Sequence, residues 1–195
     1  MQTDKIIRLA REQGVIRAAD LASIGASRTL LPYLEQKGVL RRVARGAYML
    51  VDHVPERPGF VDIAAAVPHC VIFLLSALQY HEITIQMPNA TWLAVERSSR
   101  KPVAKGFQLQ VVQLSGNMFS AGIEEYEGDG VIIRVYSPAK TVVDCFRFRN
   151  RTGLDVAREA LRDTLDQRRA SRDEIWHFAK ICRMASIMRP YLEMV

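Results

Sequence analysis

The chain has 195 residues, of which 49% are hydrophobic and 25% charged, and its formal net charge at pH 7 is +6. This length allows one large or two small domains, and the composition is that of a protein with a packed core. No apolar run approaches the ~20 residues that a membrane span needs, and the first residues lack the apolar stretch of a secretory signal. We therefore expect a cytoplasmic protein with no membrane partner.

The three cysteines, Cys70, Cys145 and Cys182, are far apart in the sequence and have apolar neighbours. An odd and scattered set is typical of reduced, buried thiols rather than of a disulfide framework or a zinc site. We expect no metal ion and no cofactor.

Residues 15–50 contain the pattern that decides the functional interpretation. A short helix is predicted from Asp20, and Gly25 ends it, because glycine adopts a positive φ angle at little steric cost. A second helix begins no earlier than about Arg28. Pro32 then falls in its first turn, where backbone N–H groups have no intrahelical partner. Gly38 stops this helix.

The second helix has an inward face, because Leu30, Leu31 and Leu34 recur at helical spacing. Two strand-like runs follow at 39–44 and 47–51, joined at Arg45-Gly46, and Val15-Ile16 is a candidate strand that pairs with them. Helix, turn, helix and hairpin together predict a winged helix-turn-helix, which places its second helix in the major groove of DNA.

The positive charge is concentrated in the same segment. Residues 1–51 hold nine Lys/Arg and four Asp/Glu, whereas the rest of the chain holds eighteen and seventeen. A basic excess on one small domain is typical of a phosphate-binding surface. The predicted DNA-binding residues are Ser27, Arg28, Thr29, Tyr33, Lys37, Arg41, Arg42 and Arg45.

These residues have different predicted roles. Arg28 is the candidate for a bidentate contact to guanine, with Ser27, Thr29 and Tyr33 at nearby bases or phosphates. The wing arginines hold the hairpin against phosphates. Two alternatives stay open: the hairpin arginines are an ordinary solvated surface, or the winged helix is a protein-interaction module.

Residues 52–59 hold two prolines and a glycine between apolar runs, which is typical of a linker. We predict a winged-helix domain over 1–54 and a second domain over 55–195. In the second domain, helices are predicted at 60–67, 73–81, from Ser137-Pro138 onward, 154–167, 175–182 and 186–194. Strands are predicted at 91–97, 107–114, 123–127 and 131–136. A small sheet with helices gathered after it makes the fold class α+β.

Two turns and two helix caps are predicted within this domain. Ser137 caps the helix that begins there, with Pro138 at the first helical position, because serine and proline are favoured at these two places. Arg100-Lys101-Pro102 lies in the turn between the first two strands, and Gly128-Asp129-Gly130 indicates a tight hairpin between the last two. Ser171 and Glu174 have the spacing of a capping box at the start of a helix.

No catalytic motif is visible. The sequence has no G-x-S-x-G elbow, no phosphate-binding loop and no H-E-x-x-H pair, and its four histidines lie singly on separate elements. We expect that the protein is not an enzyme. The rival hypothesis is a metal-dependent nuclease built on Lys140 and the hairpin carboxylates Glu124, Glu125, Glu127 and Asp129. Solvation of the hairpin explains those carboxylates more simply, because Glu124 and Glu125 face opposite sides of a strand.

A second basic cluster follows the Ser137-Pro138 helix and consists of Arg147, Arg149 and Arg151. It either extends a nucleic-acid surface or neutralises the negative C-terminal end of that helix, and we favour the second interpretation.

The chain resembles the AbiEi-type antitoxins along most of its length. The N-terminal likeness rests on Leu21, Gly25, Ser27-Arg28, Gly38, Leu40, Arg42-Val43, Arg45-Gly46 and Tyr48. The C-terminal likeness rests on Ser76-Ala77-Leu78 with His81, the run from Tyr136 to Asp144, then Phe146, Arg149, Gly153, Asp155-Val156-Ala157 and Glu159-Ala160.

The resemblance implies the antitoxin of a type IV toxin–antitoxin system. Such an antitoxin counters a nucleotidyltransferase-like toxin without a stable complex, and it represses its own operon by binding inverted repeats in double-stranded promoter DNA. We expect the helical end of the second domain to act as the antitoxin surface, with Lys140, Asp144, Arg147 and Arg149 exposed. A stand-alone transcriptional regulator is the alternative. The sequence does not decide the oligomeric state in solution, and a monomer is one of the alternatives.

Overall fold

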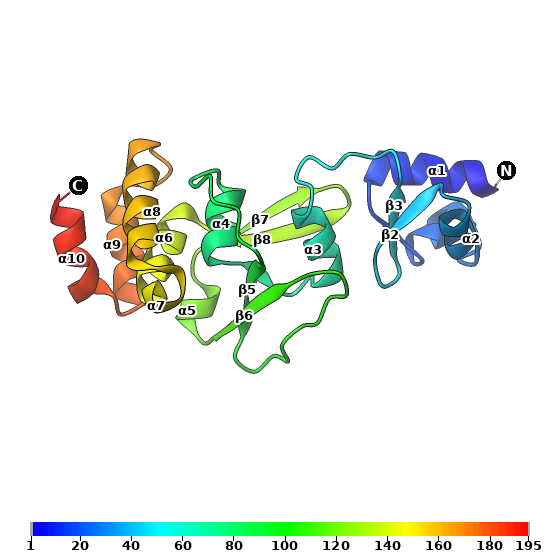
Figure 1. Cartoon of the computed structure of the whole chain (residues 1–195). Coiled ribbons are helices and arrows are strands. Elements are labelled where there is room, and N and C mark those ends of the chain that lie inside the picture. Colours follow the sequence, from blue (N-terminus) through cyan, green and yellow to red (C-terminus); the bar gives the residue numbers. More distant parts are fainter. Residues whose placement is uncertain (1, 195) are drawn as a thin grey trace. The chain divides into compact units, whose positions relative to one another are not determined.

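The computed structural model describes residues 2–194 (Figure 1). Contacts within the chain group its residues into two compact units. The leading unit comprises the residues up to Pro68 together with Tyr126–Ile133. The second unit comprises His69–Glu125 and the residues from Arg134 onward. The chain therefore passes from one unit to the other at three places. The predicted domains 1–54 and 55–195 stay a prediction. By contacts, α3 (Phe60–Ala66) and residues 126–133 group with the leading unit.

The leading unit has the predicted order of elements. They are α1 (Gln2–Gln13), β1 (Ile16–Arg17), the 3-10 helix η1 (Asp20–Ile24), α2 (Leu30–Gln36), β2 (Leu40–Ala44), β3 (Ala47–Leu50) and α3. The strands form an antiparallel sheet in the order β1-β3-β2, with Ile16 opposite Tyr48 and Leu40 opposite Leu50. The pairing of β1 with the wing confirms the expectation for Val15-Ile16.

Backbone conformation explains how the two helices of the motif are separated. Gly25 has φ +63° and Gly38 has φ +71°, both in the left-handed region where a side chain is unfavourable. Pro32 lies in the first turn of α2, so its missing N–H leaves no helical hydrogen bond unmade. The core beneath them is apolar and consists of Ile6, Ala10, Ile16, Leu21, Leu31, Leu34, Leu40, Tyr48 and Leu50.

The tip of a hairpin completes the leading unit. Asp129 and Gly130 have φ angles of +51° and +71°, which form the predicted tight turn. The Val15 N–H donates to the Asp129 carbonyl at 2.9 Å. The contact is so close that a Cβ atom on Gly14 would lie 2.7 Å from the Asp129 Cα atom.

The second unit consists of a mixed sheet followed by helices, which confirms the α+β class. Its elements are β4 (Val71–Ile72), α4 (Leu74–Tyr80), β5 (Thr91–Glu96), β6 (Leu109–Leu114), α5 (Asn117–Ser120), β7 (Ile123–Gly128), β8 (Val131–Tyr136), α6 (Pro138–Arg147), α7 (Arg149–Thr152), α8 (Leu154–Asp166), α9 (Arg172–Ile181) and α10 (Ala185–Met194). The strand order is β6-β5-β4-β8-β7, with the tips of β7 and β8 in the leading unit.

One connection differs from the sequence prediction. Strands β5 and β6 run parallel, with Thr91 opposite Leu109 and Glu96 opposite Leu114. A parallel pair cannot be joined by a tight turn, because the chain must return to the starting edge of the first strand. Residues 97–108 make this return, so Arg100-Lys101-Pro102 lies in a long loop.

Helix α6 is the centre of the second unit's core. Ser137 caps it, with the Ser137 Oγ atom accepting the Lys140 N–H at 3.3 Å, and Pro138 occupies the first turn, as predicted. Residues 139–146 are all buried. Helices α8 and α9 pack against α6, and Figure 1 shows α6 to α10 gathered at the C-terminal end, in yellow to red. Among residues 2–194, no helix is long and apolar enough to cross a membrane.

Candidate nucleic-acid interface

The two faces of α2 are separated as a recognition helix requires. Leu31 and Leu34 are buried in the core of the leading unit. On the other face Tyr33 is 50% exposed, and the Lys37 Nζ atom lies 5.7 Å from the centre of its ring. An aromatic ring and an ammonium group are therefore presented to solvent side by side.

The turn before α2 is fixed by short polar contacts. The Ser27 and Thr29 hydroxyl oxygens lie 2.7 Å apart, and the Ser27 Oγ atom accepts the Thr29 N–H at 3.4 Å. Gln2 of α1 accepts the Ser27 N–H at 3.5 Å. All three side chains are exposed, so the N-terminal end of α2 is both ordered and open to a ligand.

Two arginine side chains of this surface have no partner in the part of the chain that the structure describes. Neither the side chain of Arg28, before α2, nor that of Arg45, at the tip of the wing, has an ion pair or hydrogen bond within residues 2–194, and both residues are exposed. A guanidinium group without a protein partner keeps all five of its N–H donors for an external acceptor.

Arg42 is exposed and oriented by its own strand pair. The Arg42 Nε atom donates to the Ala44 carbonyl at 3.3 Å, and its guanidinium carbon lies 5.9 Å from the centre of the Tyr48 ring. These contacts hold the side chain along the wing, and the rest of the guanidinium group faces solvent.

Arg41 differs from the other predicted contacts because it has a carboxylate partner. Its Nη2 and Nη1 atoms lie 3.1 and 3.4 Å from the two Asp62 oxygens, and the Nη2 atom is also 3.2 Å from the Met49 sulfur. This bidentate pair joins β2 to α3. Sequence reasoning could not find it, because nothing in the residues near Arg41 points to a partner 21 positions later.

In the second unit, the expectation that Lys140 and Asp144 are exposed is wrong. Their side chains are 0% and 1% exposed, and the Lys140 Nζ atom lies 2.5 Å from the Asp144 Oδ2 atom. The same ammonium lies 4.3 Å from the centre of the buried Tyr136 ring. Burial raises the pKa of the Asp144 carboxyl, and the neighbouring Lys140 ammonium opposes that rise. The pair is part of the core.

Arg147 and Arg149 are half-buried and bind backbone carbonyls. Arg147 donates from Nη1 to the Cys182 carbonyl at 2.8 Å, at the C-terminal end of α9. Arg149 donates from Nη1 to the Phe146 carbonyl at 2.9 Å, in the last turn of α6. These contacts support the interpretation that Arg147 and Arg149 neutralise helix C-termini, Arg149 at α6 and Arg147 at α9. The Arg151 guanidinium carbon lies 5.9 Å from the centre of the Phe148 ring instead.

The groups that the nuclease hypothesis needs are engaged elsewhere. Lys140 is buried with Asp144, Glu125 pairs with Arg134 at 2.6 Å, and the Asp129 carboxylate lies against His53. Across residues 2–194 no three His, Cys, Asp or Glu side chains are placed to share a metal ion.

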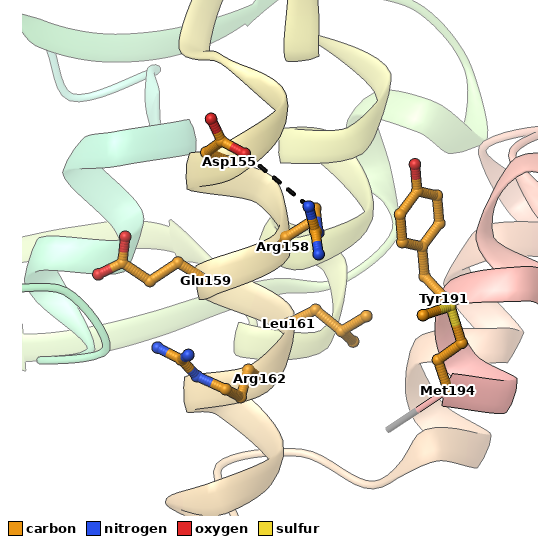
Figure 2. Close-up of a pocket in the computed structure, with 7 residues that line it drawn as sticks. All are labelled: Asp155, Arg158, Glu159, Leu161, Arg162, Tyr191 and Met194. Carbon is orange, nitrogen blue, oxygen red and sulfur yellow. Dashed lines mark ion pairs between the residues drawn. The ribbon is translucent and has the colours of Figure 1, made fainter.

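A pocket that sequence reasoning missed lies between α8 and α10 (Figure 2). Its volume is about 460 Å³, and it is lined by Asp155, Arg158, Glu159, Leu161, Arg162, Tyr191 and Met194. The lining residues come from two helices that are nearly twenty residues apart in sequence. No local motif could therefore have indicated it.

The leading unit, with the exposed face of α2 beside a basic two-stranded wing, is a winged helix-turn-helix of the kind found in transcriptional regulators. Residues 4–51 match a family model described as transcriptional regulator, AbiEi antitoxin. The match confirms the resemblance to the AbiEi-type antitoxins for the segment that contains α1, α2 and the wing. No curated protein matches the chain.

Proposed function

We propose that the protein is a DNA-binding repressor whose leading unit grips an operator through α2 and the wing. The observation that carries this proposal is the free and exposed guanidinium of Arg28 at the start of a helix whose opposite face is buried. Arg28 contacts a base edge in the major groove, and Ser27, Thr29, Tyr33 and Lys37 contact neighbouring bases or phosphates.

In the wing, Arg42 and Arg45 contact phosphates. Arg41 contributes mainly by holding β2 on α3, because Asp62 already occupies its guanidinium group. This division of roles refines the sequence prediction, in which all three arginines contact phosphates directly.

The test compares Arg28→Ala with Arg45→Ala in full-length protein, by fluorescence anisotropy on the promoter of its own operon and on a random duplex. Loss of Arg28 should cost about 1–3 kcal/mol on the promoter and reduce discrimination between the two DNAs. Loss of Arg45 should lower the affinity for both DNAs alike and reduce the slope of log K against log [salt] by about one.

Lys180→Gln is the matched control, because it removes one exposed positive charge from the second unit. It should leave both affinities unchanged. Equal losses on both DNAs for Arg28→Ala and Arg45→Ala would overturn the assigned roles. Failure of the wild-type protein to bind any duplex would overturn the proposal itself.

We further propose that the protein is the antitoxin of a type IV system, which represses its own operon at inverted repeats and counters a nucleotidyltransferase-like toxin without a stable complex. The family match at residues 4–51 and the resemblance of Tyr136–Asp144 support this. The second unit supplies the antitoxin surface. Because Lys140 and Asp144 are buried, that surface consists of exposed residues of α7 to α10.

Co-expression with the product of the adjacent gene tests the antitoxin proposal. The full-length Arg28→Ala/Arg45→Ala variant should restore growth as well as the wild type, because it is altered only in the leading unit. If neither protein restores growth, the antitoxin proposal is wrong.

The second candidate function is a stand-alone regulator that responds to a small molecule. The pocket between α8 and α10 favours it, and the absence of a neighbouring toxin gene would favour it further. A promoter whose repression by this protein is relieved by a metabolite would support this candidate.

A further inference from the structure

Helices α8 and α10 leave an unfilled space between them. Both helices belong to the layer around α6 and α9, and the Tyr191 ring of α10 rests 4.8 Å, centre to centre, from the buried Phe146 ring of α6. Leu161 of α8 is buried beside this space. The floor of the pocket is therefore apolar and anchored in the core, and its volume of about 460 Å³ lies within the range of small-molecule sites.

The charged residues of the lining do not share one orientation. In Figure 2, Arg158 and Leu161 lie on the side of α8 that faces Tyr191 and Met194, whereas Glu159 and Arg162 point away from α10. Glu159 accepts a hydrogen bond from Gln86 at 3.4 Å, and Arg162 contacts Asp163 at 3.2 Å. The cation that faces the apolar floor is Arg158.

Arg158 is only weakly engaged by protein. The distance from its Nη1 atom to the Asp155 Oδ1 atom is 4.0 Å, at the limit of an ion pair, and the Asp155 side chain is fully exposed. Such a contact contributes little in water. A ligand carboxylate lying over the floor would accept two parallel N–H donors from Arg158.

We propose that this pocket binds a small, flat, apolar monocarboxylate, with its carboxylate on Arg158 and its ring system between Leu161, Tyr191 and Met194. An apolar body is expected because the lining contributed by Leu161, Tyr191 and Met194 is apolar. A single anionic group is expected because, among residues 2–194, Arg158 is the cation of the lining that lies on the side facing α10. The lining residues of this site are not among those proposed to contact DNA, so the inference does not rest on the DNA-binding proposal. It gives a ligand class to the second candidate function, and failure of the protein to bind any duplex would leave it standing.

The test is isothermal titration of the full-length protein with 2-naphthoate, and with 2-naphthylmethanol as a ligand of the same shape without the charge. For a ligand of this size we expect saturable 1:1 binding with Kd on the order of 0.1–1 mM. 2-Naphthylmethanol should bind at least about tenfold more weakly, because it cannot form the charge-assisted pair with Arg158.

Two variants of α8 form a matched pair. Arg158→Gln and Arg162→Gln remove the same charge from the same helix one turn apart, at side chains that are 59% and 64% exposed. Because both side chains are largely in solvent, neither substitution should unfold the protein, which circular dichroism would verify. Arg158→Gln should raise the Kd for 2-naphthoate at least about tenfold and leave the Kd for 2-naphthylmethanol unchanged. Arg162→Gln should weaken the binding of 2-naphthoate much less than Arg158→Gln does, because the Arg162 side chain points away from α10.

Tyr191→Leu tests the apolar wall, because it keeps contact with Phe146 but removes the flat ring. This variant should raise the Kd for both ligands by a similar factor. The proposal is overturned if 2-naphthoate gives no saturable binding, or if Arg162→Gln weakens it as much as Arg158→Gln does. Equal affinity for the two ligands would likewise overturn it.

Discussion

The imidazole of His53 and the carboxylate of Asp129 meet inside the leading unit, with the His53 Nε2 and Asp129 Oδ1 atoms 2.5 Å apart and 76 positions apart in sequence. The other carboxylate oxygen accepts the Glu56 N–H at 3.2 Å. Asp129 therefore binds the segment after β3 through its side chain and the segment after α1 through its carbonyl. A residue of a hairpin that is distant in sequence thus joins two segments of the unit that presents α2.

Asp129→Ala should lower the free energy of unfolding by about 1–3 kcal/mol, because it leaves the His53 ring and the Glu56 N–H without their partner. Asp129→Asn should cost less, since asparagine accepts one hydrogen bond and tolerates the positive φ angle at this position. Urea denaturation monitored by circular dichroism measures both. Glu127→Ala, at an exposed neighbour on β7, is the control and should change the midpoint little. A loss for Glu127→Ala as large as that for Asp129→Ala would contradict this account.

The buried pair of Lys140 and Asp144 makes a second prediction. Asp144→Ala should destabilise the protein by about 3–5 kcal/mol, because it leaves a buried ammonium group without a counter-ion. The double variant Lys140→Met/Asp144→Leu should be far less destabilised, since it removes both charges and keeps the volume. Chemical denaturation of Lys140→Met, Asp144→Leu and the double variant gives the coupling energy between the two side chains. Additive losses would contradict a direct interaction.

The pH dependence of Lys140→Met follows from the same pair. Without the Lys140 ammonium, burial is opposed only by the Arg147 charge, the smallest of the causes that act on this group, and it raises the pKa of the Asp144 carboxyl in the folded state above the value in the unfolded chain. A group with a raised folded pKa loses stability as pH rises through that value. The variant should therefore be destabilised less at pH 5 than at pH 8, relative to the wild type at each pH. An equal deficit at both would contradict burial as the cause.

Much of the local structure could be predicted because its signals lie close together in the sequence. Gly25, Pro32 and Gly38 fix the ends of η1 and α2 through their own backbone preferences. Ser137-Pro138 and the Ser171–Glu174 capping box do the same for α6 and α9, and both caps form as predicted. The exposed face of α2 followed from the spacing of its leucines.

The long-range contacts could not be predicted. Nothing near Arg41 or Asp129 indicates a partner 21 or 76 residues away. Val71-Ile72 is too short to show a strand pattern, so the sequence did not predict β4 or its pairing, which is antiparallel with β5 and parallel with β8. Lysine is rarely fully buried, and the expectation of an exposed Lys140 followed that tendency. The partner that permits its burial lies one helical turn away, and α6 faces the core on all sides.

The pair of Arg41 and Asp62 should behave as a structural contact. Asp62→Asn and Arg41→Gln should each lower the free energy of unfolding by roughly 0.5–1.5 kcal/mol, and the double variant should cost little more than either. On DNA, Arg41→Gln should change the salt slope less than Arg45→Ala does, because Asp62 already holds the Arg41 guanidinium. Thermal denaturation and salt titrations of anisotropy measure these effects. A slope change for Arg41→Gln as large as that for Arg45→Ala would assign Arg41 to the phosphates after all.

The capping box of α9 makes the stability of the second unit depend on pH. Hydrogen bonds from the Ser171 N–H and hydroxyl lower the pKa of Glu174 from its ordinary value of 4.5. A carboxyl whose pKa is lowered in the folded state contributes stability at pH values above its pKa in the unfolded chain. This contribution is lost as pH falls through its pKa in the folded state. Glu174→Gln should therefore be less stable than the wild type at pH 7, and the difference should shrink below about pH 4.5. Denaturation midpoints at pH 7 and pH 3.5 measure this, and a constant difference would contradict it.

The most direct test of the central claim is a titration of ¹⁵N-labelled full-length protein with a short promoter duplex, followed by amide chemical shifts. The account predicts that the largest changes lie at residues 27–37 and 42–46 and that amides of α8 to α10 change little. Large changes in α8 to α10, with residues 27–37 unchanged, would contradict it and would place the DNA surface outside the winged helix.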